Sequence, residues 1–77
     1  MAKQVIVYIQ PGCPACDQEK EFLSQKGVEF VARSIGDVRA LEEILMLDAR
    51  SCPVTVINGD VIVGFDQERI ERLLGIT

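Results

Sequence analysis

Two cysteines separated by two residues, Cys13 and Cys16, stand between an apolar run and a helix-like segment. The run before them, residues 3–9, is dominated by β-branched and apolar residues, which is typical of a strand buried on both faces. Pro14 suits the first turn of a helix, where its missing N–H costs nothing. The pattern therefore predicts a strand, a short loop and a helix, with Cys13 at or next to the N-cap and Cys16 one turn inside.

This placement predicts different chemistry for the two thiols. The reactive form of cysteine is the thiolate, and a helix N-terminus offers free N–H groups and a partial positive charge. Cys13 is therefore predicted to be the acidic, exposed thiol that attacks a disulfide. Cys16 lies on the same helix face and is predicted to be the less exposed thiol that resolves the mixed disulfide.

The size and composition of the chain limit what it can be. Its 77 residues, 48% of them apolar, suffice for the core of one small domain, residues 1–77, which we expect to be a monomer. Three cysteines are too few for a disulfide framework, and no charged and apolar leader stands at the N-terminus, so we expect a cytoplasmic location. No apolar run approaches the roughly 20 residues that cross a bilayer, and a net charge of −4 without a basic cluster argues against a nucleic-acid partner. The absence of histidine rules out His-based acid–base catalysis and His-containing zinc sites.

Hydrophobic spacing and punctuation residues divide the rest of the chain into alternating elements. The predicted elements are helix 14–26, strand 28–33 running up to residue 35, helix 38–47, strands 53–57 and 60–63 joined by an Asn58-Gly59 hairpin, and helix 67–74. The predicted buried stripes are Val38, Leu41, Ile44 and Leu45 on helix 38–47, and Ile70, Leu73 and Leu74 on helix 67–74. A βαβ unit followed by ββα predicts an α/β fold with a four-stranded mixed sheet flanked by three helices. Cys13 then lies at the carboxyl end of the first strand, where α/β folds usually bind ligands.

Several short motifs lie in a fixed order along the chain. They are Val7-Tyr8, Cys13-Pro14-Ala15-Cys16, Lys20, Phe22-Leu23, Lys26-Gly27-Val28, Pro53-Val54 and Gly64-Phe65-Asp66. With these motifs at these distances, the chain resembles the thioredoxin superfamily, and within it the glutaredoxins and glutaredoxin-like redoxins, over essentially its whole length. The resemblance implies a β-α-β-α-β-β-α thioredoxin fold and a thiol–disulfide oxidoreductase with a redox-active dithiol, serving electron transport and cell redox homeostasis.

The resemblance also implies roles for two loops beyond the cysteine pair. Pro53 is expected to be the cis-proline of the fold, packed opposite the two thiols. The backbone of Cys52 is then expected to pair with an incoming substrate strand. Gly64 and Asp66 match the pattern by which glutaredoxins place a helix N-terminus against a glutathione carboxylate, although Val63 does not.

Three departures from glutathione-binding glutaredoxins concern the electron donor. Gln10 stands where a lysine or arginine is usual, and Ala15 stands where an aromatic residue is frequent. Gly64-Phe65 looks more like the redoxins that thioredoxin reductase reduces. We expect no bound cofactor, disulfide-containing protein substrates, and either glutathione or thioredoxin reductase with NADPH as the external electron donor. The predicted substrate-contacting residues are Gln10, Pro14, Ala15, Arg50, Cys52, Pro53, Gly64, Phe65 and Asp66.

Four side chains near this site carry alternative interpretations. Arg50 either contacts an anionic substrate or is an ordinary loop residue. Phe65 either presents an apolar contact to a protein substrate or packs under the last helix. Cys52 is interpreted as a small core residue, with an alternative disulfide, a third metal ligand or an oxidation sensor as the other hypotheses. Glu19 is interpreted as a carboxylate that reaches solvent or pairs with Lys20 or Lys26, and the alternative is a desolvated base for the resolving thiol.

Two other functions compete with the redox prediction. A metal or iron–sulfur carrier would use Cys13 and Cys16, with Cys52 as an optional third ligand. A closed zinc site needs four ligands and this chain supplies three cysteines, so a shared site in a dimer, which doubles the ligands, is the form of this alternative that stays open. We therefore predict no metal site within one chain. A non-catalytic redox sensor is the third possibility, and it would show a reversible disulfide without turnover.

Overall fold

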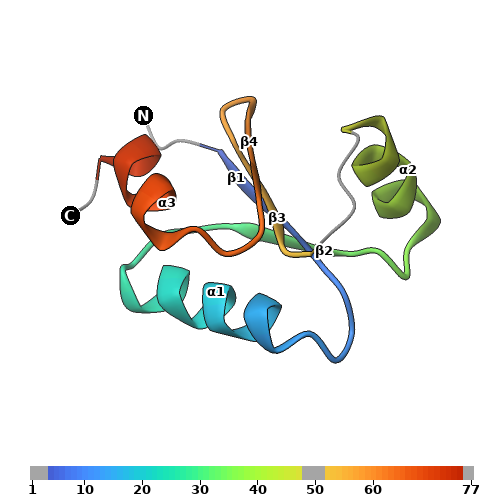
Figure 1. Ribbon diagram of the computed structural model, residues 1–77, viewed down its shortest axis with the longest axis horizontal. Helices are drawn as coiled ribbons and strands as arrows, with labels where there is room; N and C mark the ends of the chain where they lie inside the picture. The colour runs from blue at the N-terminus through green and yellow to red at the C-terminus, as the bar shows by residue number, and fades with distance from the viewer. Residues whose placement is uncertain (1–3, 48–51, 76–77) are drawn as a thin grey trace.

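The computed structural model describes residues 4–47 and 52–75, and Figure 1 shows the path of the chain. The elements are β1 (Val5–Ile9), α1 (Pro14–Gln25), β2 (Val31–Ser34), α2 (Val38–Met46), β3 (Val54–Ile57), β4 (Asp60–Val63) and α3 (Gln67–Leu74). This is the β-α-β-α-β-β-α order of the thioredoxin fold, so the predicted fold class is confirmed.

The four strands form one mixed sheet in the order β2-β1-β3-β4. β1 runs parallel to β2 and antiparallel to β3, and β4 runs antiparallel to β3. Tyr8 near the end of β1 pairs with Val54 at the beginning of β3. The loop that follows β1 and the loop that precedes β3 therefore meet at one end of the sheet.

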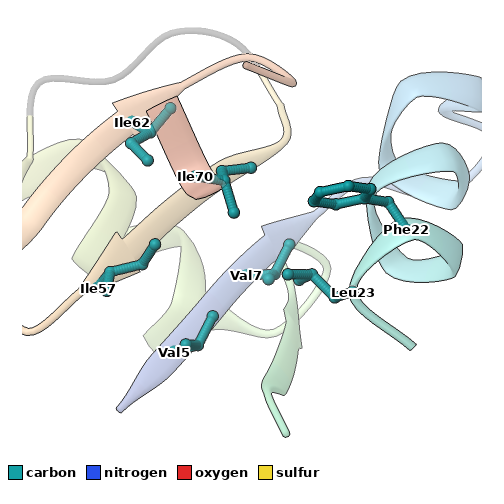
Figure 2. Packing of buried hydrophobic residues seen from close by; sticks show 7 residues of the cluster. All are labelled: Val5, Val7, Phe22, Leu23, Ile57, Ile62 and Ile70. Atoms are coloured by element: carbon teal, nitrogen blue, oxygen red, sulfur yellow. The ribbon is translucent and has the colours of Figure 1, made fainter. Parts of the chain in front are cut away.

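The helices cover both faces of the sheet, α1 and α3 on one side and α2 on the other (Figure 1). Successive side chains of a strand point to opposite faces, so the central strands supply both layers. The core under α1 and α3, drawn in Figure 2, consists of Val5, Val7, Phe22, Leu23, Ile57, Ile62 and Ile70. The smaller core under α2 consists of Tyr8, Ala40, Ile44 and Val54.

The second strand begins at Val31, three residues later than predicted. The reason lies in how α1 ends. Gly27 has φ 71°, its N–H donates to the carbonyl of Ser24, and the N–H of Val28 donates to the carbonyl of Leu23. These two bonds form a Schellman motif, which commits the Val28 N–H to the helix terminus and delays the strand.

The packing of α2 differs from the predicted stripe. Ile44 is buried as predicted, whereas Val38, Leu41 and Leu45 are exposed. Ala40, one turn before Ile44, completes the side of α2 that packs on the sheet. Apolar spacing therefore located the helix, but a small alanine rather than the leucines lies against the strands.

The stripe predicted for α3 is confirmed. Ile70 is fully buried, and Leu73 and Leu74 pack against the same core. Among the described residues, no helix combines the length and the apolar character needed to cross a membrane.

Candidate active site

Cys13 is the N-cap residue of α1, as the sequence predicted. Its backbone is extended, with φ −98° and ψ 109°, and Pro14 begins the helix behind it. Gly12 enters this turn with φ 74°, a left-handed conformation that favours glycine. The Cys13 Sγ accepts a hydrogen bond from the backbone N–H of Cys16 at 3.3 Å. The thiol thus takes the place of the hydroxyl or carboxylate that usually caps a helix.

The second loop of the site begins β3 and faces Cys13. The Cys52–Pro53 peptide bond is cis, as the family resemblance implied. The Cys13 thiol donates to the carbonyl oxygen of Cys52, with Sγ and O 3.8 Å apart. Pro53 is buried, and its carbonyl accepts the N–H of Gly64 at 2.7 Å. The dithiol loop, the cis-proline loop and the end of β4 are therefore joined by hydrogen bonds.

The two thiols of the pair differ in exposure and acidity. Cys13 is partly exposed, whereas the side chain of Cys16 is buried. Hydrogen bonds from the Cys16 thiol and from the Cys16 backbone N–H lower the pKa of Cys13. Desolvation by burial, with the Cys13 hydrogen bond adding to it, raises the pKa of Cys16 to about 11. This arrangement can hold Cys13 as a thiolate while Cys16 stays protonated.

Gly64, Phe65 and Asp66 lie at the start of α3, but they serve the fold in different ways. Asp66 is the N-cap, and its Oδ1 accepts the N–H of Arg69 at 3.1 Å. The Phe65 ring packs on Phe22, with the ring centroids 5.7 Å apart. The packing interpretation of Phe65 is therefore the one that the structure supports, and its ring also borders an open groove between α1 and the start of α3.

The remaining predicted contact residues surround the dithiol to different degrees. Gln10 and Pro14 are exposed, and Ala15 is partly exposed between the cysteines. A backbone hydrogen bond from Gln10 partly offsets the raised pKa of Cys16. Arg50 lies outside the described residues.

Cys52 is partly buried and packs against the core under α2. Burial raises the pKa of its thiol, and the charge of Cys13 raises it further. This agrees with the interpretation of Cys52 as a small core residue beside the site. Within residues 4–47 and 52–75, no three cysteine, aspartate or glutamate side chains are grouped so that they could hold a metal ion.

The favoured interpretation of Glu19 was wrong. Its side chain is fully buried, and it accepts a hydrogen bond from the Thr55 hydroxyl of β3. Lys20 pairs instead with Asp17. Burial raises the pKa of Glu19, and the hydrogen bond from Thr55 opposes this effect. The sequence held a signal for this position, because Glu19 follows Cys16 by three residues on the buried side of α1.

Lys26, the second lysine considered as a partner of Glu19, forms its ion pair elsewhere. The Lys26 ammonium lies 3.8 Å from a carboxylate oxygen of Glu71 on α3 and 5.8 Å from the centroid of the Phe22 ring. Lys26 therefore links the two helices at the surface rather than reaching the buried side of α1.

Together these features define a class: a thioredoxin-fold domain whose Cys-x-x-Cys pair opens the first helix and faces a cis-proline. Comparison with known proteins makes the assignment narrower. The glutaredoxin family pattern matches residues 5–62. An uncharacterized glutaredoxin-like 8.6 kDa protein in the rubredoxin operon of Clostridium pasteurianum is 37% identical over 70 residues, covering 88% of this chain and 93% of that protein. The chain belongs to the glutaredoxin family.

Solved structures agree with this assignment. A single-residue variant of the thioredoxin-like protein BC3987 superposes with a TM-score of 0.93 at 37% identity, covering 96% of this chain and 97% of that one. The glutaredoxin grx-1 from Archaeoglobus fulgidus superposes with a TM-score of 0.78 at 26% identity, covering 92% of this chain and 85% of that one.

Proposed function

We propose that this protein is a thiol–disulfide oxidoreductase that reduces protein disulfides or glutathione mixed disulfides through a Cys13–Cys16 dithiol cycle. The observation that supports the proposal most is the contrast between the two thiols. Cys13 is partly exposed at a helix N-terminus with a lowered pKa, while Cys16 is buried behind it with a raised one. Membership of the glutaredoxin family supports the same redox chemistry.

The cycle has two displacement steps. The Cys13 thiolate attacks one sulfur of the substrate disulfide, forms a mixed disulfide and releases the first substrate thiolate. The Cys16 sulfur then attacks Cys13 Sγ, forms the Cys13–Cys16 disulfide and releases the second substrate thiolate. Two electrons from an external donor restore the dithiol, so the cycle needs no bound cofactor.

The donor in this proposal is either glutathione or thioredoxin reductase with NADPH. Gln10 is an uncharged, exposed residue at the position expected to carry a cation for glutathione, which favours the reductase. Either donor operates in a reducing compartment, so the cytoplasmic location belongs to the same proposal. The experiment supplies the oxidised protein separately with glutathione and glutathione reductase, and with thioredoxin reductase, and follows NADPH consumption in each. Turnover with one donor and not the other identifies the physiological class of donor.

Substitutions of the two cysteines test the cycle itself. Cys13→Ser should abolish reduction of a protein disulfide such as insulin, and Cys16→Ser should trap the mixed disulfide, which mass spectrometry detects. Glu21→Gln, an exposed substitution on the same helix, is the matched control and should turn over normally. Retained activity in Cys13→Ser would refute the proposal. Visible absorbance or bound metal in the freshly purified protein would favour a metal or iron–sulfur carrier instead.

A further inference from the structure

The side of α1 that packs on the sheet contains one ionisable group that the dithiol cycle does not use. Cys16, Glu19, Phe22 and Leu23 are the buried residues of this helix. The last two point into the apolar core with Val7 (Figure 2). Glu19 is fully buried beside them, which is rare for a glutamate that has no ionic partner within the described part of the chain.

The two carboxyl oxygens of Glu19 differ. Oε2 accepts the hydroxyl of Thr55, while Oε1 is buried and has no hydrogen-bond partner among the described residues. A buried acceptor without a donor is costly, and the cost is greater when the group is charged. Such a carboxyl gains most from a proton, because protonation removes the buried charge.

A thiol with a proton to lose, that of Cys16, lies on the same side of the helix as Glu19. Residues three apart in a helix are neighbours on one face, and both side chains lie on the buried side of α1. Cys16 must lose its proton at the moment when it attacks the mixed disulfide on Cys13. Its sulfur is buried, and its raised pKa means that it begins this step as a thiol.

Among residues 4–47 and 52–75, Glu19 takes part in no ion pair. Thr55 is its polar contact on β3, and β1 and α3 contribute apolar residues to the core beside α1. The nearby ammonium groups are engaged at the surface, Lys20 with Asp17 and Lys26 with Glu71 of α3. Cys16 is therefore the titratable group that shares the buried face with Glu19.

We propose that Glu19 is the proton acceptor for Cys16 in the resolution step. This inference rests on the dithiol cycle proposed above. As the Cys16 sulfur bonds to Cys13 Sγ, the bond between Cys13 and the substrate sulfur breaks and its electron pair leaves with the substrate thiolate. The Cys16 proton passes to the Glu19 carboxylate. When a donor later reduces the Cys13–Cys16 disulfide, Glu19 returns the proton to the departing Cys16 sulfur.

A single-turnover experiment separates this step from the first attack. Reduced protein is mixed with one equivalent of dithiobis(nitrobenzoate), in a Cys52→Ser background so that only Cys13 and Cys16 react. Attack by Cys13 releases the first coloured thiolate, and resolution by Cys16 releases the second. The first phase should be absent in Cys13→Ser, and the second phase should be absent in Cys16→Ser. The first phase therefore tests the attack by Cys13 independently of the role of Glu19.

Glu19→Gln should leave the first phase unchanged and slow the second at least about a hundredfold near neutral pH, the lower end of the range for loss of a general base. In the starting protein the second-phase rate should level off once Glu19 is ionised. In Glu19→Gln it should keep rising with pH. Glu21→Gln is the matched exposed control and should match the starting protein in both phases.

Thr55→Val gives a second measurement in which the carboxyl group of Glu19 is kept. Loss of the Thr55 hydrogen bond removes the effect that opposes the raised pKa of Glu19, so the levelling should move to higher pH. A folded Glu19→Gln protein with an unchanged second phase and an unchanged pH profile would overturn the role of Glu19 while leaving the dithiol cycle intact. Absence of a second phase in the starting protein would overturn both.

Discussion

The burial of Glu19 predicts an unusual dependence of stability on pH. Burial raises the pKa of Glu19 in the folded protein above its ordinary value of 4.5. Between these two pKa values the folded state binds more protons than the unfolded state. The stabilisation from protonated Glu19 is therefore complete below the unfolded pKa and is lost as pH rises through the folded pKa. Glu19→Gln removes this loss.

The size of the effect follows from the unpartnered oxygen. Leaving a buried acceptor without a donor costs about 1–3 kcal/mol, and more when the group is charged. The buried amide of Glu19→Gln has costs of its own, but they do not change with pH. The quantity to compare is therefore the stability difference between the two proteins, which should shift in favour of Glu19→Gln by about 1–3 kcal/mol between low and high pH.

Urea unfolding followed by far-ultraviolet circular dichroism measures this difference, since the chain has no tryptophan. Measurements at about pH 4.5 and about pH 8.5 compare the two sides of the predicted loss, because the raised pKa keeps folded Glu19 more than half protonated at the lower pH and it is more ionised at the higher pH. Glu21→Gln controls for removal of a surface carboxylate from the same helix. A stability difference that stays constant between the two pH values would refute the claim that Glu19 titrates in a buried site.

Three further predictions concern packing, the end of α1 and the reactive thiol. Leu23→Ala should lower the free energy of unfolding by about 2–5 kcal/mol, measured by urea unfolding, because Leu23 is fully buried in the core under α1. Gly27→Ala should cost about 1 kcal/mol in the same assay, because φ at this position is 71°. Iodoacetamide should label Cys13 at a lower pH than Cys52, since the pKa of Cys13 is lowered and that of Cys52 is raised. Protein is labelled at a series of pH values, and mass spectrometry of its peptides measures the labelled fraction of each cysteine. Labelling of Cys52 at a lower pH than Cys13 would contradict the prediction.

Features that depend on neighbouring residues were predictable from the sequence. The predicted N-cap Cys13 is observed, because a cap bonds to N–H groups two or three residues away. The hairpin at Asn58-Gly59 also follows from local preference, since both residues have positive φ.

Features that depend on distant residues were not predictable in the same way. Glu19 is buried because α1 places it against Thr55, which lies 36 residues further along the chain. The exposed stripe of α2 has a similar origin, since the sheet accepts Ala40 and Ile44 and leaves Leu45 in solvent. The resemblance to glutaredoxins supplied the cis bond before Pro53, which local spacing could not.

The position of the two site loops on the sheet also determines how the site can open. The Cys13 loop follows β1 and the Cys52–Pro53 loop precedes β3, and these are the two central strands. Edge elements such as β2 and α2 can exchange their amide hydrogens through local fraying, because few partners hold them. The strand ends that carry Cys13 and the cis-proline are paired in the central β1–β3 ladder, so these anchors separate only when that ladder opens. Amide exchange in the paired residues of β1 and β3 should therefore follow the global unfolding equilibrium, which makes the anchors of the reactive geometry as durable as the domain itself.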